Sequence, residues 1–250
     1  MISALWEDEK WQYGRARLPR FLLESIMRYG GVRIRCLLAQ IRGICPMAML
    51  VADPYVENRL RAERRASGAD CYDEVWEGIY MMVPMPADEH QQIAMRMAAI
   101  FQETVGWPEL GEVRAGINLS DRGDDWEHDY RVPDVAVFLH DGGAENCGTH
   151  WRGAADLLVE ITSPGDRTRE KIPFYDRLGV VELLLVDRQS WTLELYRRDK
   201  GQLQEVGRSS VDAGEVLGSA AVPLTFQLVS GDPRPQIQVT HVASGRQWMV

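Results

Sequence analysis

The chain has 250 residues, of which 45% are hydrophobic and 26% are charged, and its formal net charge is -9. This composition is that of a globular protein rather than a disordered or fibrous one, and the length suits one large domain or one domain with an appendage. No apolar run reaches the roughly 18 residues that a membrane-spanning helix needs, so we expect no membrane association. The four cysteines show no CxxC spacing, which predicts reduced thiols and a cytoplasmic protein.

The charge is distributed unevenly along the chain. Residues 1–48 hold eight basic and four acidic side chains, a balance of +4, which leaves -13 for the other 202 residues. An acidic body argues against a general nucleic-acid coat protein, because affinity for phosphates comes from clustered Lys and Arg. It does not argue against a nuclease, because a metal site itself needs carboxylates.

Residues 1–48 are predicted as an N-terminal basic extension, and their apolar members suit one or two short helices. Three interpretations stay open: a basic arm for nucleic acid, an interfacial or partner helix, and an extension with little fixed structure. The third would follow from translation that starts upstream of a natural start at Met47 or Met49. We expect the main domain to cover residues 49–235 and a C-terminal tail to cover residues 236–250.

Within the main domain, acids and arginines alternate from residue 53 to 67, which indicates a solvated helix or a linker. Asp88 is the predicted N-cap of the first amphipathic helix. Apolar periodicity and turn residues then predict alternating elements. In chain order these are strand, helix, three strands, helix and two strands, over residues 72–83, 88–105, 112–119, 132–139, 157–162, 167–179, 181–186 and 191–196. The order predicts an α/β domain with a mixed β-sheet flanked by helices, since hairpins argue against a purely parallel sheet.

Common cofactor and catalytic motifs are missing from the sequence. It contains no phosphate-binding GxxxxGK[ST], no GxGxxG, no HExxH and no GxSxG. Two carboxylates in strand-like runs remain. Asp134 opens one buried strand, and Glu160 lies inside the next, in Leu-Leu-Val-Glu-Ile. A buried carboxylate must be protonated, paired or bound to a metal, because an unpaired buried charge is costly.

If the two strands are neighbours, Asp134 and Glu160 converge on one divalent cation. Mg²⁺ accepts one or two protein carboxylates and leaves its other positions to water and substrate phosphate. Such an ion polarises a phosphoryl oxygen and lowers the pKa of its bound water. Lys171 follows the second strand and is the candidate that would position the water and stabilise developing charge, and Tyr175 lies one helical turn further on the same face.

Several motifs of this sequence have the order and spacing that are found in a known family. They are Glu74-Val-Trp-Glu-Gly, Pro84-x-Pro-x-x-Glu89-His90-Gln91, Arg131-Val-Pro-Asp134-Val-Ala-Val, Leu158-Val-Glu160-Ile-Thr-Ser-Pro-Gly-Asp166, Arg169-Glu-Lys171-Ile-Pro-Phe-Tyr175 and Leu184-Leu-Val-Asp187. Over about residues 70–200 they resemble the Uma2 family of restriction-endonuclease-like proteins, which is similar to the PD-(D/E)XK nuclease superfamily. The resemblance implies a mixed sheet flanked by helices, a Mg²⁺-type metal and phosphodiester hydrolysis.

The resemblance makes Asp134 and Glu160 the two metal-binding carboxylates. The superfamily lysine would stand at Thr162, which cannot act as a cation, whereas the Uma2 family commonly carries its lysine on the following helix, as Lys171 does here. Pro173 is then expected in the first turn of that helix, with Lys171 at its edge. Relatives often have an acid at the position of Ile79, and its absence leaves Glu74 or Glu77 as substitutes.

We therefore expect a metal-dependent endonuclease that hydrolyses DNA. Asp134, Glu160 and Lys171 are the expected catalytic residues, with Mg²⁺ or Mn²⁺ as cofactor. His90 and Tyr175 are secondary candidates, as are Glu74 and Glu77. Two alternatives remain: a non-catalytic nuclease-fold module that serves binding or protein interaction, and a hydrolase of RNA or a small phosphodiester. A homodimer is expected by analogy, because a duplex has two strands to cut.

Overall fold

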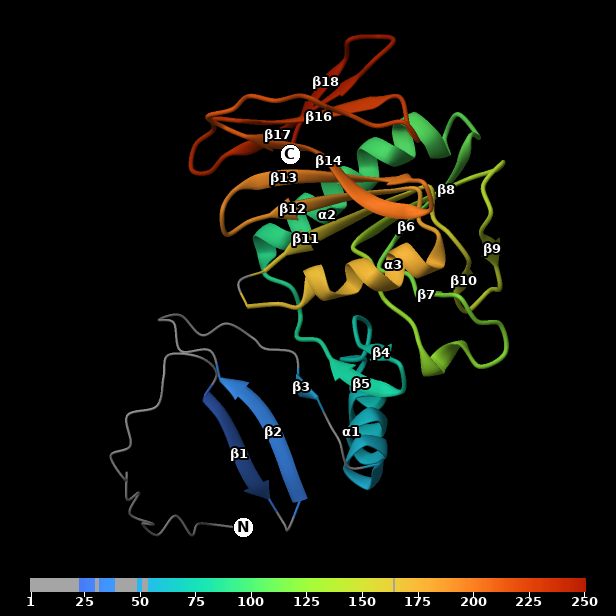
Figure 1. Ribbon diagram of the computed structural model, residues 1–250, viewed down its shortest axis with the longest axis vertical. Helices are drawn as coiled ribbons and strands as arrows, with labels where there is room; N and C mark the ends of the chain where they lie inside the picture. The colour runs from blue at the N-terminus through green and yellow to red at the C-terminus, as the bar shows by residue number, and fades with distance from the viewer. Residues whose placement is uncertain (1–22, 30–31, 39–48, 51–53, 164) are drawn as a thin grey trace.

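The computed structural model describes residues 23–29, 32–38, 49–50, 54–163 and 165–250, and up to residue 54 it describes the course of the backbone alone. A six-stranded sheet forms the centre (Figure 1). In spatial order its strands are β14 (Gln202–Ser210), β13 (Thr192–Asp199), β12 (Glu182–Asp187), β11 (Leu157–Thr162), β8 (Val135–Leu139) and β6 (Gly111–Ala115). Strands β11 and β12 are parallel and every other pair in this sheet is antiparallel. The predicted mixed sheet is confirmed.

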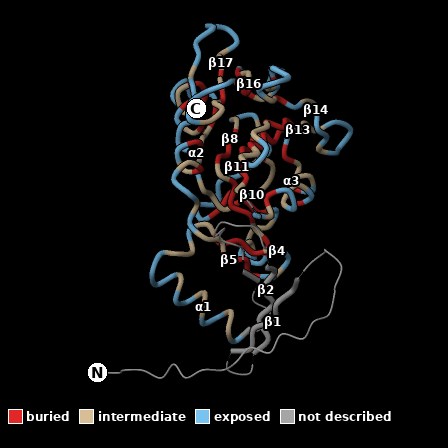
Figure 2. The backbone as a smooth tube through the Cα atoms, turned by 90° about the vertical axis from the view of Figure 1, so that its left-hand side faces the viewer, coloured by how far each residue is buried: buried red, intermediate tan, exposed pale blue. Residues whose placement is uncertain are grey.

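The two faces of this sheet are covered by different helices. Side chains that alternate along β11 point to opposite faces. Leu157, Val159 and Ile161 pack with the apolar face of α2 (Asp88–Phe101), whereas Leu158 packs with residues of α3 (Ile172–Leu178). Figure 2 shows that buried residues concentrate along β8 and β11, while α1 (Pro54–Ser67) carries intermediate and exposed residues. Glu160 therefore faces the α3 side.

The start of α2 differs from the sequence prediction, whereas the start of α3 agrees with it. Helix α2 begins at Asp88 itself, and Ala87 is its N-cap without a side-chain bond, so the prediction of Asp88 as the cap is wrong. A π-helical turn (Gln102–Gly106) extends α2. A 3₁₀ turn (Thr168–Lys171) leads into α3, which has Pro173 in its first turn and Gly179 in a left-handed C-cap. This arrangement confirms that Lys171 lies at the edge of the helix.

The last strands of the chain form a second sheet. It contains β15 (Leu217–Gly218), β16 (Leu224–Val229), β17 (Gln236–His241) and β18 (Gln247–Met249), all antiparallel. Phe226 packs edge-on against Phe101 of α2 with 6.4 Å between ring centroids. Ile237, Val239 and Val250 are fully buried in the same core. Residues 236–250, expected as a tail, are instead part of this sheet, because their alternating apolar residues complete the core over α2.

A smaller unit lies on the side of the central sheet where α3 begins (Figure 1). Strand β5 (Ile79–Met82) pairs with β4 (Glu74–Trp76) and with β3 (Met49–Leu50), and α1 packs beside them. The short strands β7 (Leu119–Ser120), β9 (Glu145–Asn146) and β10 (Trp151–Arg152) form a third sheet, and a 3₁₀ turn spans Trp126–His128.

Only part of the predicted N-terminal extension is described. There the chain forms β1 (Leu23–Tyr29) and β2 (Val32–Leu38), an antiparallel pair rather than the expected short helices. Two apolar-polar runs separated by Gly30-Gly31 suit a hairpin as well as they suit helices. The rest of residues 1–48 lies outside the described residues. In the described part of the chain, no helix is both long and apolar enough to cross a membrane.

Candidate active site

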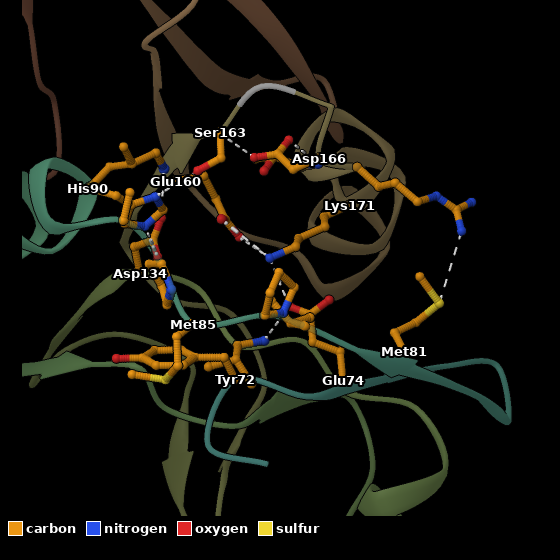
Figure 3. A pocket seen from close by; sticks show the side chains of 18 of the residues that line it. Tyr72, Glu74, Met81, Met85, His90, Asp134, Glu160, Ser163, Asp166 and Lys171 are labelled. Atoms are coloured by element: carbon orange, nitrogen blue, oxygen red, sulfur yellow. Dashed lines mark hydrogen bonds and ion pairs between the residues drawn. The ribbon is translucent and has the colours of Figure 1, made fainter. Parts of the chain in front are cut away.

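A cavity of about 280 Å³ lies between the end of β11, the start of α3 and the β4–β5 hairpin (Figure 3). Six of the seven residues that the sequence singled out either line this cavity or contact its lining. Glu74, His90, Asp134, Glu160 and Lys171 line it, and Tyr175 lies directly beneath Glu160. Glu77, the seventh, does not belong to the cavity: it is exposed in the β4–β5 turn, where its backbone has a φ of 50°.

Asp134 is placed beside Glu160 by the pairing of two neighbouring strands. Strands β8 and β11 are antiparallel, with Val135 opposite Val159. One residue back along β8 and one residue forward along β11, Asp134 therefore lies opposite Glu160. The Ile161 backbone N–H donates to Asp134 Oδ2 at 2.7 Å. On the other side, His90 Nε2 lies 2.8 Å from Asp134 Oδ1. Asp134 is thus held from both sides with lone pairs left on each oxygen.

His90 itself is fixed by a second contact. It is a buried residue of the first turns of α2, and its Nδ1 lies 3.3 Å from Ser163 Oγ. A histidine with both ring nitrogens engaged keeps one orientation, which in turn orients its carboxylate partner. Helix α2, which covers one face of the sheet, therefore supplies His90, which positions Asp134 at the start of β8.

Lys171 joins two carboxylates from different parts of the fold. Its Nζ lies 2.8 Å from Glu74 Oε1 and 3.1 Å from Glu160 Oε1. Glu74 is held by the Trp76 indole N–H at 2.6 Å and by the Val132 N–H at 2.9 Å. Because the 3₁₀ turn ends at Lys171 and α3 begins at Ile172, Lys171 is at the helix edge, and its ammonium reaches Glu160 of β11. The structure thus brings the ammonium of Lys171, and not a side chain at position 162, next to Glu160.

Thr162 lies elsewhere, although it shares the β11 face with Glu160. Its hydroxyl accepts a hydrogen bond from the Arg188 backbone N–H at 3.3 Å and lies 3.5 Å from Asp187 Oδ1. Tyr175, one turn after Lys171, donates its hydroxyl hydrogen to Glu160 Oε1. Glu160 therefore receives both the ammonium of Lys171 and the phenol of Tyr175, and its Oε2 has only the longer 3.4 Å contact to Lys171.

Burial and charge shift the pKa values of this network. Burial, with the like charges of Asp134 and Glu74, raises the pKa of Glu160 to about 8, against the opposing effect of Lys171. Burial alone would lower the pKa of Lys171, but the negative charge of Glu160 and then of Glu74 outweighs it and raises that pKa, so Lys171 stays a cation. Burial, followed by the charge of Glu160, raises the pKa of Tyr175 well above its usual value and keeps it a hydrogen donor.

Three carboxyl groups thus share a single ammonium in one buried cluster, and the charges of Asp134 and Glu74 add to burial in raising the pKa of Glu160. A divalent cation between Asp134 and Glu160 would favour the ionised form of Glu160. Within the described residues, no group of three or more His, Cys, Asp or Glu side chains is arranged to hold a metal. Mg²⁺ does not require three, because it accepts one or two carboxylates and keeps several waters. The free lone pairs of Asp134 and of Glu160 Oε2 therefore fit such an ion.

Sequence reasoning did not identify Trp76 and Arg167 as site residues. Both line the cavity, and the Arg167 guanidinium lies 4.9 Å from the centre of the Trp76 ring. Arg167 also contacts Met81 Sδ at 4.0 Å and pairs with Glu170. The only local signal was the basic residue after the Ser163–Asp166 turn, because the partners of Arg167 in the cavity are distant in sequence.

Comparisons with known proteins show which family this chain belongs to. A sequence model of the Uma2 family, described as "Putative restriction endonuclease", matches residues 69–230. A solved structure that is similar to this chain is the crystal structure, at 1.96 Å resolution, of a putative nuclease belonging to DUF820 from Anabaena variabilis. It is 22% identical, with a TM-score of 0.44, over 53% of this chain and 75% of that chain. No curated protein matches the sequence. The family match spans more than half of the chain and includes the whole cavity, so the chain belongs to the Uma2 family.

Proposed function

We propose that this protein is a metal-dependent endonuclease that hydrolyses phosphodiester bonds in DNA, with Asp134 and Glu160 holding Mg²⁺ or Mn²⁺. The observation that carries the proposal is the Lys171 ammonium, 3.1 Å from Glu160 and in the same cavity as Asp134. Two carboxylates and a cation around one cavity suit phosphoryl transfer, which depends on positioning and on stabilising charge. Membership of a family described as restriction endonucleases supports the same reaction.

The reaction needs a water molecule and no other co-reactant. The oxygen of water forms a bond to phosphorus, the bond from phosphorus to one ester oxygen breaks, and a proton passes to that leaving oxygen. One product end carries the phosphate and the other a hydroxyl. A bound divalent ion supplies Lewis-acid stabilisation of the phosphoryl charge. Lys171, which stays protonated, donates hydrogen bonds that position the water and stabilise negative charge on phosphorus oxygens.

The remaining polar residues hold these groups in place. His90 fixes Asp134 at 2.8 Å, and Glu74 holds Lys171 at 2.8 Å. Tyr175 donates to Glu160 and favours its ionised form. These three act as positioning residues, because each one holds a catalytic side chain through a hydrogen bond or an ion pair. We expect the enzyme to act as a homodimer in the cytoplasm, where its exposed thiols Cys71 and Cys147 remain reduced.

The test is DNA cleavage at low salt with Mn²⁺, on mixed plasmid and single-stranded DNA, for the wild type and Glu160→Gln. This substitution keeps the shape of the side chain and removes its charge, so we expect a loss of roughly a hundredfold or more in rate. Glu112→Gln changes a half-exposed residue of β6 that does not line the cavity; it is the matched control and should retain full activity. Circular dichroism would establish that both variants are folded.

Two results would contradict the proposal. Equal cleavage by the wild type and Glu160→Gln would remove Glu160 from the mechanism. Absence of cleavage in both, together with no heat in a calorimetric titration with Mn²⁺, would favour a non-catalytic nuclease-fold module that serves binding or interaction.

A further inference from the structure

The cavity has two chemically different walls. Asp134, Glu160 and Lys171 lie on one of them, and hydrolysis needs only these polar groups. The facing wall comes from the β4–β5 hairpin and the segments on either side of it, and it is mainly aromatic and apolar (Figure 3). Its side chains include Tyr72, Trp76, Met81, Pro84, Met85 and Pro86. The proposed reaction gives this second wall no function.

The catalytic groups lie at the bottom of the cavity rather than on a surface. The side chains of Glu160, Asp134 and Lys171 are only 3%, 12% and 13% exposed. A scissile phosphate must therefore enter the cavity to reach them. A phosphate in a regular duplex lies on the outside of a stiff double strand, with its base held inside the stack. Enzymes that need a base in a recessed pocket act on single strands or turn the nucleotide out of the stack.

The net charge of the chain and the cations of the cavity also disfavour a duplex substrate. The chain after residue 48 carries a balance of -13, and proteins that grip a duplex neutralise many phosphates with Lys and Arg. Of the cations that line the cavity, Lys171 belongs to the catalytic wall, where Glu74 and Glu160 hold it, and Arg188 lies 2.9 Å from Glu89. Few further cations in the cavity are available to hold the nucleic acid, so apolar contact with a base has to contribute much of the affinity there.

Arg167 lies where the two walls meet. Its guanidinium lies against the Trp76 ring and the sulfur of Met81, while its outer side pairs with the exposed Glu170. A guanidinium in this place offers a phosphate two parallel hydrogen bonds, and exchange of an exposed carboxylate for a phosphate costs little. One nucleotide can then span the cavity, with its phosphate at Arg167 and the catalytic wall and its base on the apolar wall.

We infer that the substrate of this site is DNA with an unpaired nucleotide, as in single strands or bulges, rather than a fully paired duplex. The inference rests on the proposed nuclease function. The apolar wall contacts the base, and Arg167 binds the phosphate. Stacking and apolar contact with a base tolerate any sequence, because every base has a flat face, so the preference is for strandedness and not for sequence.

The test compares one labelled oligonucleotide in three forms: single-stranded, fully paired, and paired with one bulged nucleotide. We expect wild-type enzyme with Mn²⁺ to cleave the single strand at least about tenfold faster than the full duplex, and to cut the bulged duplex at the bulge. Equal or faster cleavage of the full duplex overturns the inference and leaves the nuclease function intact. Cleavage of no form contradicts the nuclease function itself.

Binding gives a second readout that is independent of activity. Fluorescence anisotropy with the Glu160→Gln variant should show tighter binding of the single strand, and equal or tighter binding of the duplex overturns the inference. Met85→Ala should weaken binding of the single strand by roughly fivefold to tenfold. Met95→Ala is the matched control: Met95 on α2 is 69% exposed against 65% for Met85, and it does not line the cavity.

Arg167→Gln separates the phosphate contact from the base contact. We expect weaker binding of the single strand and a salt dependence reduced by about one phosphate contact, a change of roughly 0.7 in the log–log slope. An abasic oligomer, which keeps the sugar-phosphate backbone and lacks every base, should bind Met85→Ala and wild type equally well. If Met85→Ala and Met95→Ala have the same affinity for the intact single strand, the apolar wall is not a base-binding surface.

Discussion

Glu160 connects the proposed metal site to pH. Burial and the charges of Asp134 and Glu74 raise its pKa to about 8, and a carboxylate must lose its proton to bind a metal. Mn²⁺ therefore competes with one proton in the physiological range. We expect the Mn²⁺ affinity to rise about tenfold per pH unit from about pH 6 to about pH 8 and to level off above it. Calorimetric titration measures this dependence, and an affinity that does not change with pH in this range would contradict it.

Asp129 gives a residue-scale prediction for stability. Its carboxylate is buried and lies 2.9 Å from Arg131 and 3.0 Å from Arg177, and it accepts the Glu77 N–H. Burial alone would raise its pKa, but the Glu77 hydrogen bond and Arg131 outweigh burial and lower it. Asp129→Asn leaves the buried Arg131 without its charged partner. We expect a loss of about 3 kcal/mol in the free energy of unfolding at neutral pH.

The sign of the pH dependence follows from that lowered pKa. A carboxylate with a depressed folded-state pKa stabilises the fold above its unfolded pKa, near about 4, and this contribution disappears as pH falls through the folded pKa. The difference between wild type and Asp129→Asn should therefore shrink as denaturant unfolding is measured at successively lower pH. Asp125→Asn breaks an exposed pair with Arg122 in the same loop and should leave stability unchanged. A pH-independent difference for Asp129→Asn would show that altered hydrogen bonding, and not the lost charge, is responsible.

Some residues of the candidate site could be predicted from the sequence and others could not. Glu160 is conspicuous because an acid interrupts an apolar strand, and Asp134 because it opens the neighbouring one. The contact between Arg167 and Trp76 joins residues 91 positions apart and leaves no periodic or local signal. Glu77 illustrates the opposite error, since it resembles Glu74 in sequence but lies in the turn, three positions away and outside the cavity.

At the scale of elements, the apolar wall of the cavity depends on α1. Arg64 of that helix donates to Asp73 at 2.5 Å and to the Val83 carbonyl oxygen at 3.0 Å, and so ties the helix to both ends of the β4–β5 hairpin. Asp73 is buried and also accepts hydrogen bonds from the Tyr80 hydroxyl and the Val83 N–H. One exposed helix with weak apolar character thereby fixes a wall of the candidate active site.

Arg64→Met should loosen that wall. It leaves Asp73 buried without a cation, so we expect a loss of about 3 kcal/mol in the free energy of unfolding. Hydrogen exchange should accelerate in residues 74–82 while the central strand β11 keeps its protection. Arg65→Met, on the same helix with a 3.8 Å contact to Asp70, is the matched control and should change neither quantity. Unchanged exchange in the hairpin of Arg64→Met would show that other contacts hold it.

Elements with a clear hydrophobic periodicity or a proline at their boundary were predictable from the sequence. Short strands that pair as hairpins were not. The alternation in β11 and the proline before α3 determine both elements locally. The hairpin of β4 and β5 appeared as one strand over residues 72–83, because its turn consists of Glu77-Gly78, both with positive φ, and glutamate is an uncommon residue there. Strands β1 and β2 were expected as helices, because seven-residue runs with mixed polarity fit either period.

At the scale of the whole molecule, α2 is shared by two sheets. The central sheet covers one side of it, and the sheet of β15–β18 contributes Phe226, Val239 and Val250 to the same core. The expected tail was a poor prediction, because strands of three to six residues with one buried face resemble loops when their partners are unknown. Closure of the core by the last residues is a tertiary property that no local pattern encodes.

This closure predicts that the C-terminal segment stabilises the domain that carries the active site. Val239 is fully buried opposite Phe226, so Val239→Ala removes apolar contacts and leaves a cavity, at a cost of about 2 kcal/mol. Val242→Ala makes the same change at a residue that is 65% exposed in the same hairpin and should cost nothing measurable. Denaturant unfolding followed by tryptophan fluorescence compares the two variants. The core on α2 joins the C-terminal sheet to the central sheet that carries the cavity. Val239→Ala should therefore unfold in a single transition with an unchanged m-value. A separate early transition would show that the C-terminal sheet unfolds independently of the central sheet.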